Sequence, residues 1–468
     1  MPAYSLPRLL GIERNQIALA EHTFSDLQSG ISKSTILPAG VYCLPEGLAV
    51  NSDNVVIDGN GCRLIGDFES GSGIKLNGRR NVTLRNLQIA GYRHGIVCEN
   101  CDGITIQNCH VRQTIEIAPN TIFLDIWLNE ENCYGAGILL VNCTNCEIVD
   151  NDLQHQQNGI LTYHCSHLRI KNNNVSYSSG YGIHLFDTSD SLFESNCADY
   201  CCRFEPREGG RHYGHMGADA TGFLIVYNSC RNVFKRNTAR MGGDGFFLAG
   251  LSPDGTKVGC NDNLFEENDA SLSPNIAFEA TFSSGNRFLN NYADRCNYGF
   301  WLGFSTENTI SGNRMIHNRQ AGIGVENGTN ISVTNNDFQK NGHGVLLWTH
   351  FVEQFAKQFP ENITSSHWDI TDNTFLKNRI GIRIAADQDH GIRNLPVKRS
   401  GQAQTRPRYH RIIRNQIHEG RLGIELSNCD HTEIRENIVS GNSVANFSQI
   451  DCNDTTIINN LGAGGGYL

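Results

Sequence analysis

The sequence lacks a long apolar run, has little proline and carries no excess of basic charge. Only 11 of its 468 residues are Pro, and its formal net charge is −10. A transmembrane helix needs about 20 consecutive apolar residues, so we expect no membrane partner. Phosphate binding requires a basic surface, so we expect no nucleic-acid partner. The first residues also lack the apolar core of a signal peptide, which predicts a cytoplasmic protein.

What the chain has in abundance argues against a helical protein. It contains 48 Gly and many Asn, and both residues are poor helix formers. From residue 73 a motif recurs, in which Gly is followed by alternating apolar and other residues and then by a polar turn. It begins at Gly73, Gly95, Gly137, Gly159, Gly182, Gly222, Gly245, Gly299, Gly322, Gly344, Gly381 and Gly423, with Asn275 taking the Gly place once.

The shortest intervals between these residues are 22 to 24 residues, a period typical of a solenoid. Within each repeat the apolar residues alternate as they do in a strand. The repeats have neither the Leu pattern of a leucine-rich horseshoe nor the length of a propeller blade. An Asn also recurs eight residues before the Gly, and stacked Asn side chains form hydrogen-bonded ladders. These residues are Asn151, Asn174, Asn237, Asn291, Asn336, Asn373 and Asn415.

The sequence therefore predicts an all-β protein, a right-handed parallel β-helix of about thirteen coils, each coil made of three short strands. We expect residues 1–50 to form an N-terminal cap and residues 51–468 to form a single β-helix domain. Departures from the period predict insertions near residues 113–135, 199–220, 350–367 and 387–410. The insertion at 350–367 contains apolar residues at helical spacing, typical of a packing helix or, alternatively, a lid.

Two consecutive repeats carry a family resemblance. The segments Asn81–Ile89 and Gly95–Ile106 resemble the pectin-lyase-like superfamily, and most of all the repeats of NosD-type carbohydrate-binding β-helices and alginate epimerases. The resemblance implies the β-helix fold but no single reaction, because the superfamily contains lyases, hydrolases, epimerases and non-catalytic binders. The Asp-Pro-His-Asp signature of the epimerases is absent, so that activity is not carried over.

The cysteines follow the repeat as well. Cys101, Cys143, Cys165 and Cys429 each lie six residues after a repeat Gly, which favours a buried column of free thiols at one turn. Disulfides and a metal site are the alternatives.

Strand alternation also predicts which side chains face outward, since the first and third residues after the repeat Gly point into the core and the second and fourth point out. The outward set is rich in aromatic residues. If the insertions do not bury them, these rings could be platforms for sugars. The candidate substrate-binding residues of this set are Tyr163, Trp301, Trp348 and Arg383.

Four acidic residues are the candidates for catalysis. Asp219 and Asp244 lie just before the Gly of successive repeats, and Glu279 and Glu326 are expected to share the fourth position, two coils apart. Glycoside hydrolysis needs such paired carboxylates, one to protonate the leaving oxygen and the other to activate water or attack carbon.

A densely charged insertion offers a second chemistry. With the outward His184, its basic residues could neutralise a uronate carboxylate while His or Tyr removes the adjacent proton. The alternative is a loop held by its own ion pairs, and the His and Cys spacing fits no standard zinc site. The candidates in the insertion are Arg203, Arg207, Arg211, His212 and His215.

From these residues we expect an enzyme that cleaves or transfers glycosidic bonds of a polysaccharide or oligosaccharide, without cofactor or metal. The active groups are expected on the coils from Gly182 to Gly322. A polyuronate lyase or epimerase and a non-catalytic glycan-binding β-helix are the alternatives. The sequence leaves the oligomeric state open, a homo-oligomer included.

Overall fold

The computed structural model describes residues 30–68, 70–116, 123–206, 214–216, 219–386 and 406–462, with the backbone alone for 204–206 and 214–216. By its internal contacts the chain divides into two compact units, Met1–Phe223 and Leu224–Leu468. Strand β20 (Thr221–Val226) crosses that boundary in the sequence. In each unit the chain runs in turn through parallel sheets that we call A, B and C, where sheet A contains the longest strands.

The first unit is built from three parallel ladders and one small hairpin. Sheet A contains β3 (Leu48–Val50), β6 (Ser72–Asn77), β9 (His94–Glu99), β12 (Ala136–Val141), β14 (Ile160–Tyr163) and β16 (Tyr181–Phe186). Sheet B contains β1 (Thr35–Ile36), β4 (Val56–Asp58), β7 (Thr83–Arg85), β10 (Thr105–Gln107), β13 (Glu147–Val149), β15 (Arg169–Lys171) and β17 (Leu192–Glu194). Sheet C contains β2 (Val41–Cys43), β5 (Arg63–Ile65), β8 (Gln88–Ala90) and β11 (His110–Arg112), and the antiparallel hairpin pairs β18 (Phe204–Pro206) with β19 (Gly214–Met216).

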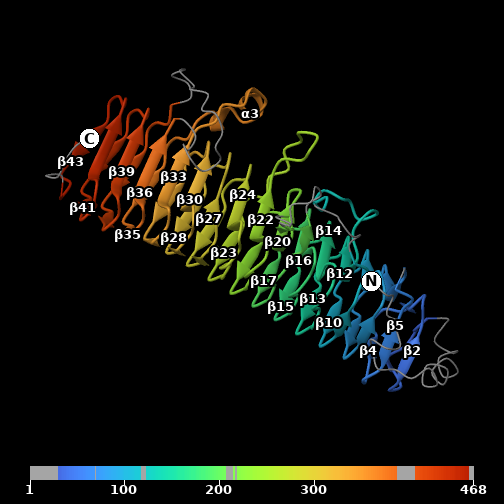
Figure 1. The fold of residues 1–468 in the computed structure, drawn as a ribbon. Coiled ribbons are helices and arrows are strands. Elements are labelled where there is room, and N and C mark those ends of the chain that lie inside the picture. The colour runs from blue at the N-terminus through green and yellow to red at the C-terminus, as the bar shows by residue number, and fades with distance from the viewer. Residues whose placement is uncertain are drawn as a thin grey trace. The chain divides into compact units, whose positions relative to one another are not determined.

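The second unit repeats the same three ladders, and its strands lie side by side in chain order (Figure 1). Sheet A contains β22 (Asp244–Ala249), β24 (Ile276–Thr281), β27 (Tyr298–Trp301), β30 (Ala321–Glu326), β33 (His343–Trp348), β36 (Ile380–Ala385), β39 (Leu422–Ser427) and β42 (Ala445–Ile450). Sheet B contains β21 (Val233–Lys235), β23 (Leu264–Glu266), β25 (Arg287–Leu289), β28 (Thr309–Ser311), β31 (Ser332–Thr334), β34 (Asp369–Thr371), β37 (Arg411–Ile413), β40 (Glu433–Arg435) and β43 (Thr456–Ile458). Sheet C contains β26 (Tyr292–Asp294), β29 (Arg314–Ile316), β32 (Asp337–Gln339), β35 (Thr374–Leu376), β38 (Gln416–His418) and β41 (Ile438–Ser440).

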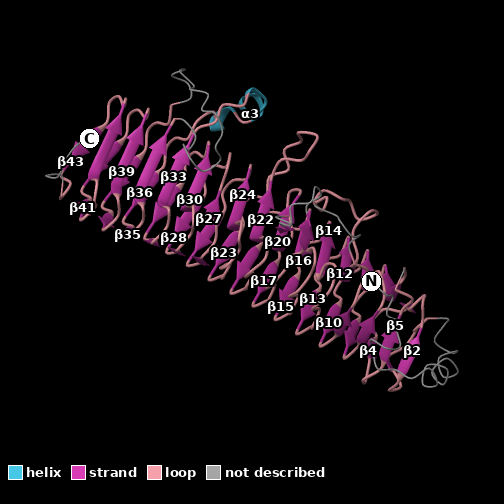
Figure 2. Ribbon diagram, in the orientation of Figure 1, coloured by secondary structure: helices cyan, strands magenta, loops and turns pink. Residues whose placement is uncertain are grey.

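Helical structure is scarce in the described residues, as Figure 2 shows by colour. Helix α3 (Glu353–Gln358) and the short 3-10 helix η2 (Pro360–Asn362) lie in the insertion expected at 350–367. The Phe355 ring of α3 packs edge-on against Phe282 and Phe304, with ring centroids 5.2 and 4.9 Å apart. These contacts favour a packing helix over a lid. No helix in the described ranges is long and apolar enough to cross a membrane.

The expected inward residues form the core. Ile183, Leu185, Phe223, Ile225, Phe246 and Leu248 all have an exposed fraction of 0%. The Phe246 ring also packs edge-on against Phe234 and Phe265 of sheet B, with centroids 6.1 and 5.6 Å apart, so it points into the coil and confirms the predicted strand register. In the second unit, rings from successive coils stack inside the β-helix, for example Phe246 on Phe278 with centroids 5.1 Å apart. That distance follows from the spacing of about 4.8 Å between paired strands.

The predicted Asn ladder is present, with one correction. In each rung an Asn Nδ2 donates to the Oδ1 of the Asn on the next coil, as from Asn336 to Asn373 at 3.0 Å. The residue in the ladder after Asn151 is Asn173, whereas the Oδ1 of the expected Asn174 accepts a hydrogen bond from the Ser176 amide.

The thiol column is also as predicted. Cys101, Cys143 and Cys165 are buried, and the Cys143 amide donates to Cys165 Sγ at 3.4 Å. Burial raises the pKa of the Cys165 thiol well above its usual value, which keeps this thiol protonated and unreactive.

Coil stacking begins earlier in the sequence than we expected. Strands β1 and β3 lie inside the expected cap, yet they already pair in parallel with β4 and β6. A further insertion lies between Leu251 and Lys257, which form an antiparallel bridge, within the 30-residue interval from Gly245 to Asn275 that already exceeded the repeat period.

Candidate active site

The outer face of sheet A brings two columns of side chains together. One column holds the residue just before the repeat Gly, and the other holds the second residue after it. Tyr298 and Trp301 occupy these places on one coil, and their ring centroids are 4.8 Å apart. The Gly between the columns is needed for space, since a Cβ at Gly245 would lie 2.6 Å from the Ala277 carbonyl oxygen.

Glu279 lies in the second of these columns. In the sheet A register it is aligned with Phe247 on the preceding coil and Trp301 on the next. The residue in the Gly place of this coil is therefore Ala277, and the expectation that Asn275 holds that place is wrong by two residues. Glu279 and Glu326 consequently do not share a position, because Glu326 is aligned with Trp348. A shift of two residues preserves the facing of a strand, so Glu279 still points outward.

Asp244 lies in the other column, one coil earlier. It is 1% exposed, and its Oδ1 accepts a hydrogen bond of 2.8 Å from the Ile276 amide. Burial, and second the negative charge of Asp244, raise the pKa of the Glu279 carboxyl well above its ordinary value. Two carboxylates in one poorly hydrated place cannot both ionise without a large electrostatic cost. Glu279 therefore holds a proton at a pH where an exposed Glu has lost it.

Glu279 forms part of the wall of a pocket of about 400 Å³. The other lining residues are Asn275, Ile276, Asn297, Tyr298, Trp301, Arg319 and Gln320. Asn275, Asn297 and Gln320 come from successive coils. The Gln320 amide donates to the Asn297 carbonyl at 2.9 Å, and the Tyr298 amide donates to the Asn275 carbonyl at 3.0 Å. Arg319 Nε donates to the Asn297 side-chain oxygen at 3.0 Å. The pocket thus combines one protonated acid, one indole, a row of amides and one guanidinium group.

The two candidate tryptophans have different environments. Trp301 is half-buried and lines the pocket. Trp348 is completely buried in a cluster with Ile276, Tyr298 and Leu346, so neither face of its ring is open to a sugar. Trp301 packs edge-on against this cluster, with its ring centroid 5.2 Å from that of Trp348. Trp348 therefore supports the wall that carries Trp301.

Sequence reasoning missed most of the polar rim. Arg319, Gln320 and Asn297 precede the repeat Gly, and the strand alternation was applied only to the residues that follow it. His343 occupies the place before Gly344, and its Nδ1 lies 3.0 Å from the Gln320 carbonyl oxygen. Burial lowers the pKa of His343 to about 4. The signal that could have identified this column is its content of polar and aromatic residues just before the repeat Gly, in strands whose core positions are apolar.

In the first unit, His184 and Tyr163 lie together under an aromatic cover. His184 is 2% exposed, with ring centroids 5.2 Å from Tyr163 and 5.5 Å from Tyr181. Burial lowers the pKa of His184 to about 3, so the imidazole is neutral at neutral pH. Within the described ranges, His184 Nδ1 and the Tyr181 hydroxyl are buried without a hydrogen-bond partner.

The charged insertion is only partly described. Arg203 donates to Asp219 Oδ1 and Oδ2 at 2.8 and 2.6 Å, and both side chains are buried. The Leu124 amide also donates to this carboxylate. Asp219 is thus held by structural hydrogen bonds, as the alternative of a loop tied by its own ion pairs anticipates. Arg207, Arg211 and His212 lie outside the described residues, and for His215 only the backbone in β19 is described.

The remaining candidates make local pairs. Glu326 Oε1 lies 2.8 Å from His350 Nδ1, and Glu326 does not line the pocket beside Glu279. Arg383 Nε donates to Glu425 Oε2 at 3.1 Å, and these two residues occupy the same column as Glu279, on later coils.

Two family models match the chain. Residues 47–254 match the model described as periplasmic copper-binding protein (NosD), and residues 251–352 match the model of a right handed beta helix region. With the parallel ladders above, they define a right-handed parallel β-helix of the pectin-lyase-like fold. No curated protein matches the sequence.

Solved structures with similar folds share little sequence with the chain. The A-module of a mannuronan C-5 epimerase from Azotobacter vinelandii is 11% identical with a TM-score of 0.37, covering 94% of each chain. A DFA-IIIase from Arthrobacter chlorophenolicus A6 is 13% identical with a TM-score of 0.40, covering 64% of this chain and 70% of that one. The periplasmic alginate epimerase AlgG is 13% identical with a TM-score of 0.39, covering 96% of this chain and 90% of that one. At this level of similarity these structures carry no argument about the reaction.

The copper named by the first family model has no fitting site in the described ranges. No group of three or more His, Cys, Asp or Glu there could hold a metal ion. The buried thiols instead donate to backbone carbonyls, as Cys143 Sγ does to the Cys98 carbonyl at 3.3 Å. We therefore derive no step through a metal.

Proposed function

We propose that the protein acts on a polysaccharide or oligosaccharide and cleaves or transfers a glycosidic bond, with Glu279 as the proton donor. The observation that carries the proposal is the place of Glu279 in the pocket wall beside Trp301, where burial and the charge of Asp244 raise the pKa of its carboxyl group. A general acid works best when its pKa lies near the working pH, and a hydrophobic wall beside a second carboxylate is one arrangement that achieves this.

The pocket residues have distinct roles in this reaction. The Trp301 ring packs against the apolar face of a sugar, and the rim amides of Asn275, Asn297 and Gln320 bind its hydroxyl groups. The Glu279 proton passes to the glycosidic oxygen as the bond between that oxygen and the anomeric carbon breaks. Asp244 is buried and does not line the pocket, so it is a positioning residue that keeps Glu279 protonated.

Glu279 is the only carboxylate among the described residues that line the pocket. Hydrolysis also needs a second group that activates water or forms the glycosyl intermediate. A proton donor for the leaving oxygen is required by hydrolysis, transglycosylation and elimination alike. The products formed therefore decide among these reactions.

The decisive experiment is a product assay on a panel of neutral and acidic polysaccharides. New reducing ends without ultraviolet absorbance indicate hydrolysis, and ultraviolet-absorbing unsaturated ends indicate elimination. We expect Glu279→Gln to slow turnover by about 10²–10⁴-fold, while Glu425→Gln, in the same column but paired with Arg383, retains activity. Equal activity of the Glu279→Gln variant and the wild type would refute the role of Glu279.

A second candidate is favoured by the buried Tyr181 hydroxyl and His184 Nδ1, which lack partners among the described residues. Tyr or neutral His can remove the proton next to a uronate carboxyl group, which is lyase or epimerase chemistry. In that case His184→Ala abolishes the unsaturated or epimerised product and Glu279→Gln does not. Binding of a glycan without any product would instead support the non-catalytic alternative.

A further inference from the structure

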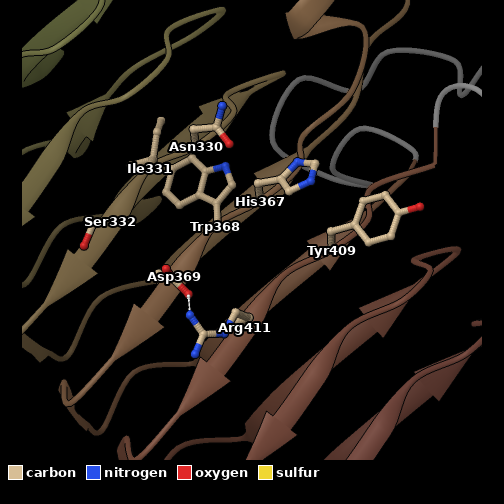
Figure 3. A pocket seen from close by; sticks show the side chains of 8 residues that line it. All are labelled: Asn330, Ile331, Ser332, His367, Trp368, Asp369, Tyr409 and Arg411. Carbon is tan, nitrogen blue, oxygen red and sulfur yellow. Dashed lines mark hydrogen bonds and ion pairs between the residues drawn. The ribbon is translucent and has the colours of Figure 1, made fainter.

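A second pocket lies on the outer face of sheet B in the second unit. Its volume is about 280 Å³, and Figure 3 shows the side chains around it. It belongs to different strands from the pocket at Glu279, which is on sheet A. The lining residues are Asn330, Ile331, Ser332, His367, Trp368, Asp369, Tyr409 and Arg411.

The first cause of this pocket is a change of side-chain size along a turn column. Asn330, His367 and Tyr409 occupy the same turn on successive coils, each with a left-handed φ of 53°, 54° and 60°. The His367 and Tyr409 rings pack together with centroids 5.0 Å apart. Asn330 has no ring, so the row of rings ends at His367. One face of the His367 ring is therefore not covered by another ring.

A second column changes size at the same place. Ser332, Asp369 and Arg411 are register partners in sheet B. Asp369 accepts a hydrogen bond of 2.9 Å from Arg411 Nη1, whereas Ser332 is short. In both columns the side chains thus become smaller from the coil of β34 to the coil of β31. The buried Trp368 beneath is fixed, because its Nε1 donates to the Gly328 carbonyl oxygen at 2.9 Å.

The pocket presents unused hydrogen-bonding groups. Over the ranges that the structure describes, the Asn330 side-chain amide, the Ser332 hydroxyl and the His367 ring nitrogens have no hydrogen-bond partner in the protein. Specific binding sites combine an apolar wall with a few such convergent polar groups.

We propose that this pocket on sheet B, which we call the notch, binds one neutral sugar unit of a polysaccharide chain. The notch is separate from the proposed active site. Its volume is just below the range of about 300–1,000 Å³ typical of ligand pockets, which suits a single ring. The open face of His367 packs against the apolar face of the sugar. The Asp369 carboxylate accepts from sugar hydroxyls. The Arg411 guanidinium group is already paired with Asp369 at 2.9 Å and with Glu433 at 3.5 Å, so it is not available to bind a uronate carboxylate. Such a site holds a polymer on the protein independently of the reaction.

The test uses the full-length chain in affinity electrophoresis through gels that contain dextran, galactomannan, hydroxyethyl cellulose or alginate. Asn330→His extends the row of rings into the notch, and the left-handed turn already accepts His at residue 367. Glu307→His is the matched control, since Glu307 is exposed in the same turn column with a φ of 57° and does not line the pocket. Each variant is also made in a Trp301→Ala background, which isolates binding at the notch from binding at the Glu279 pocket.

We expect at least one neutral polysaccharide to retard the wild type, the Glu307→His variant and the Trp301→Ala variant. Asn330→His should weaken that retention about tenfold or more in either background. Retention that Asn330→His leaves unchanged, or no retention by any neutral polysaccharide, would overturn the proposal. Retention by alginate alone that Asn330→His abolishes would overturn the assignment to a neutral sugar. None of these outcomes depends on whether Glu279 is catalytic.

Discussion

Removal of one Asn side chain from the ladder should destabilise its coil strongly. Asn336 is 2% exposed, and Asn336→Ala removes four hydrogen bonds. Its Nδ2 donates to the Ile310 carbonyl at 2.9 Å and to Asn373 Oδ1 at 3.0 Å. Its Oδ1 accepts from the Asn313 amide at 2.8 Å and from Asn313 Nδ2 at 3.1 Å. At about 0.5–1.5 kcal/mol for each net hydrogen bond, the expected cost is about 2–6 kcal/mol.

The neighbouring Asn335 provides a matched control. It is exposed and has a left-handed φ of 56°, so Asn335→Ala should cost only about 1 kcal/mol through the strained turn. Because long repeat structures unfold with incomplete cooperativity, the measurement is native-state amide exchange at the coils that contain Ile310, Asn313 and Asn373. A local free energy of opening that falls equally in the two variants would show that the buried ladder does not stabilise the coils as argued.

Two further predictions concern buried charges. Arg203→Met should destabilise the first unit by about 3–5 kcal/mol, because it leaves the buried Asp219 carboxylate without its ion-pair partner. Chemical denaturation measures this loss. The double variant Arg203→Met/Asp219→Leu should recover most of the lost stability, and a double variant that recovers none would show that the pair itself is the main source of stability. Glu279→Gln should raise the melting temperature at pH 7–8 and have little effect near pH 4. The pKa of Glu279 is raised in the native state, so the stability of the wild type falls as the pH rises above the unfolded-state pKa of about 4.3. A difference in melting temperature between variant and wild type that does not change over this pH range would contradict the raised pKa.

The alternation of apolar residues was enough to predict the fold and its core. A side chain such as Ile183 or Phe246 has only two choices in a strand, inward or outward, and the apolar pattern decides between them. The Asn ladder was predictable to within one residue for a similar reason, since its members are buried and recur with the coil. At residues 172–174, three Asn stand in a row, and their order in the sequence does not reveal which one joins the buried ladder.

The register error at residue 275 has a clear physical cause. Ile276 and Phe278 fit the two apolar positions that follow each repeat Gly, so Asn275 was given the Gly place. The repeat Gly is needed for the close approach of the next coil, and it has no positive φ at Gly245. Ala277 satisfies a requirement for small size, and Asn275 is left to line the pocket.

The candidate site was harder to predict because facing does not determine exposure. His184, Trp348 and Asp244 all belong to outward columns, yet each is almost completely buried. Neighbouring large side chains cover Trp348, and aromatic rings cover His184. Which outward residues remain accessible depends on side-chain size on adjacent coils and on the insertions, and neither follows from a single repeat.

The β-helix assigns chemistry to a residue through the column in which it stands. Glu279 and Glu425 are the same amino acid at the same position of different coils. Glu425 lies beside Arg383 and forms an ion pair of 3.1 Å. Glu279 lies between Phe247 and Trp301 with Asp244 behind it, which favours the protonated acid. The backbone at the two sites is equivalent. The side chains on adjacent coils therefore decide whether the Glu is a potential proton donor or part of a structural ion pair.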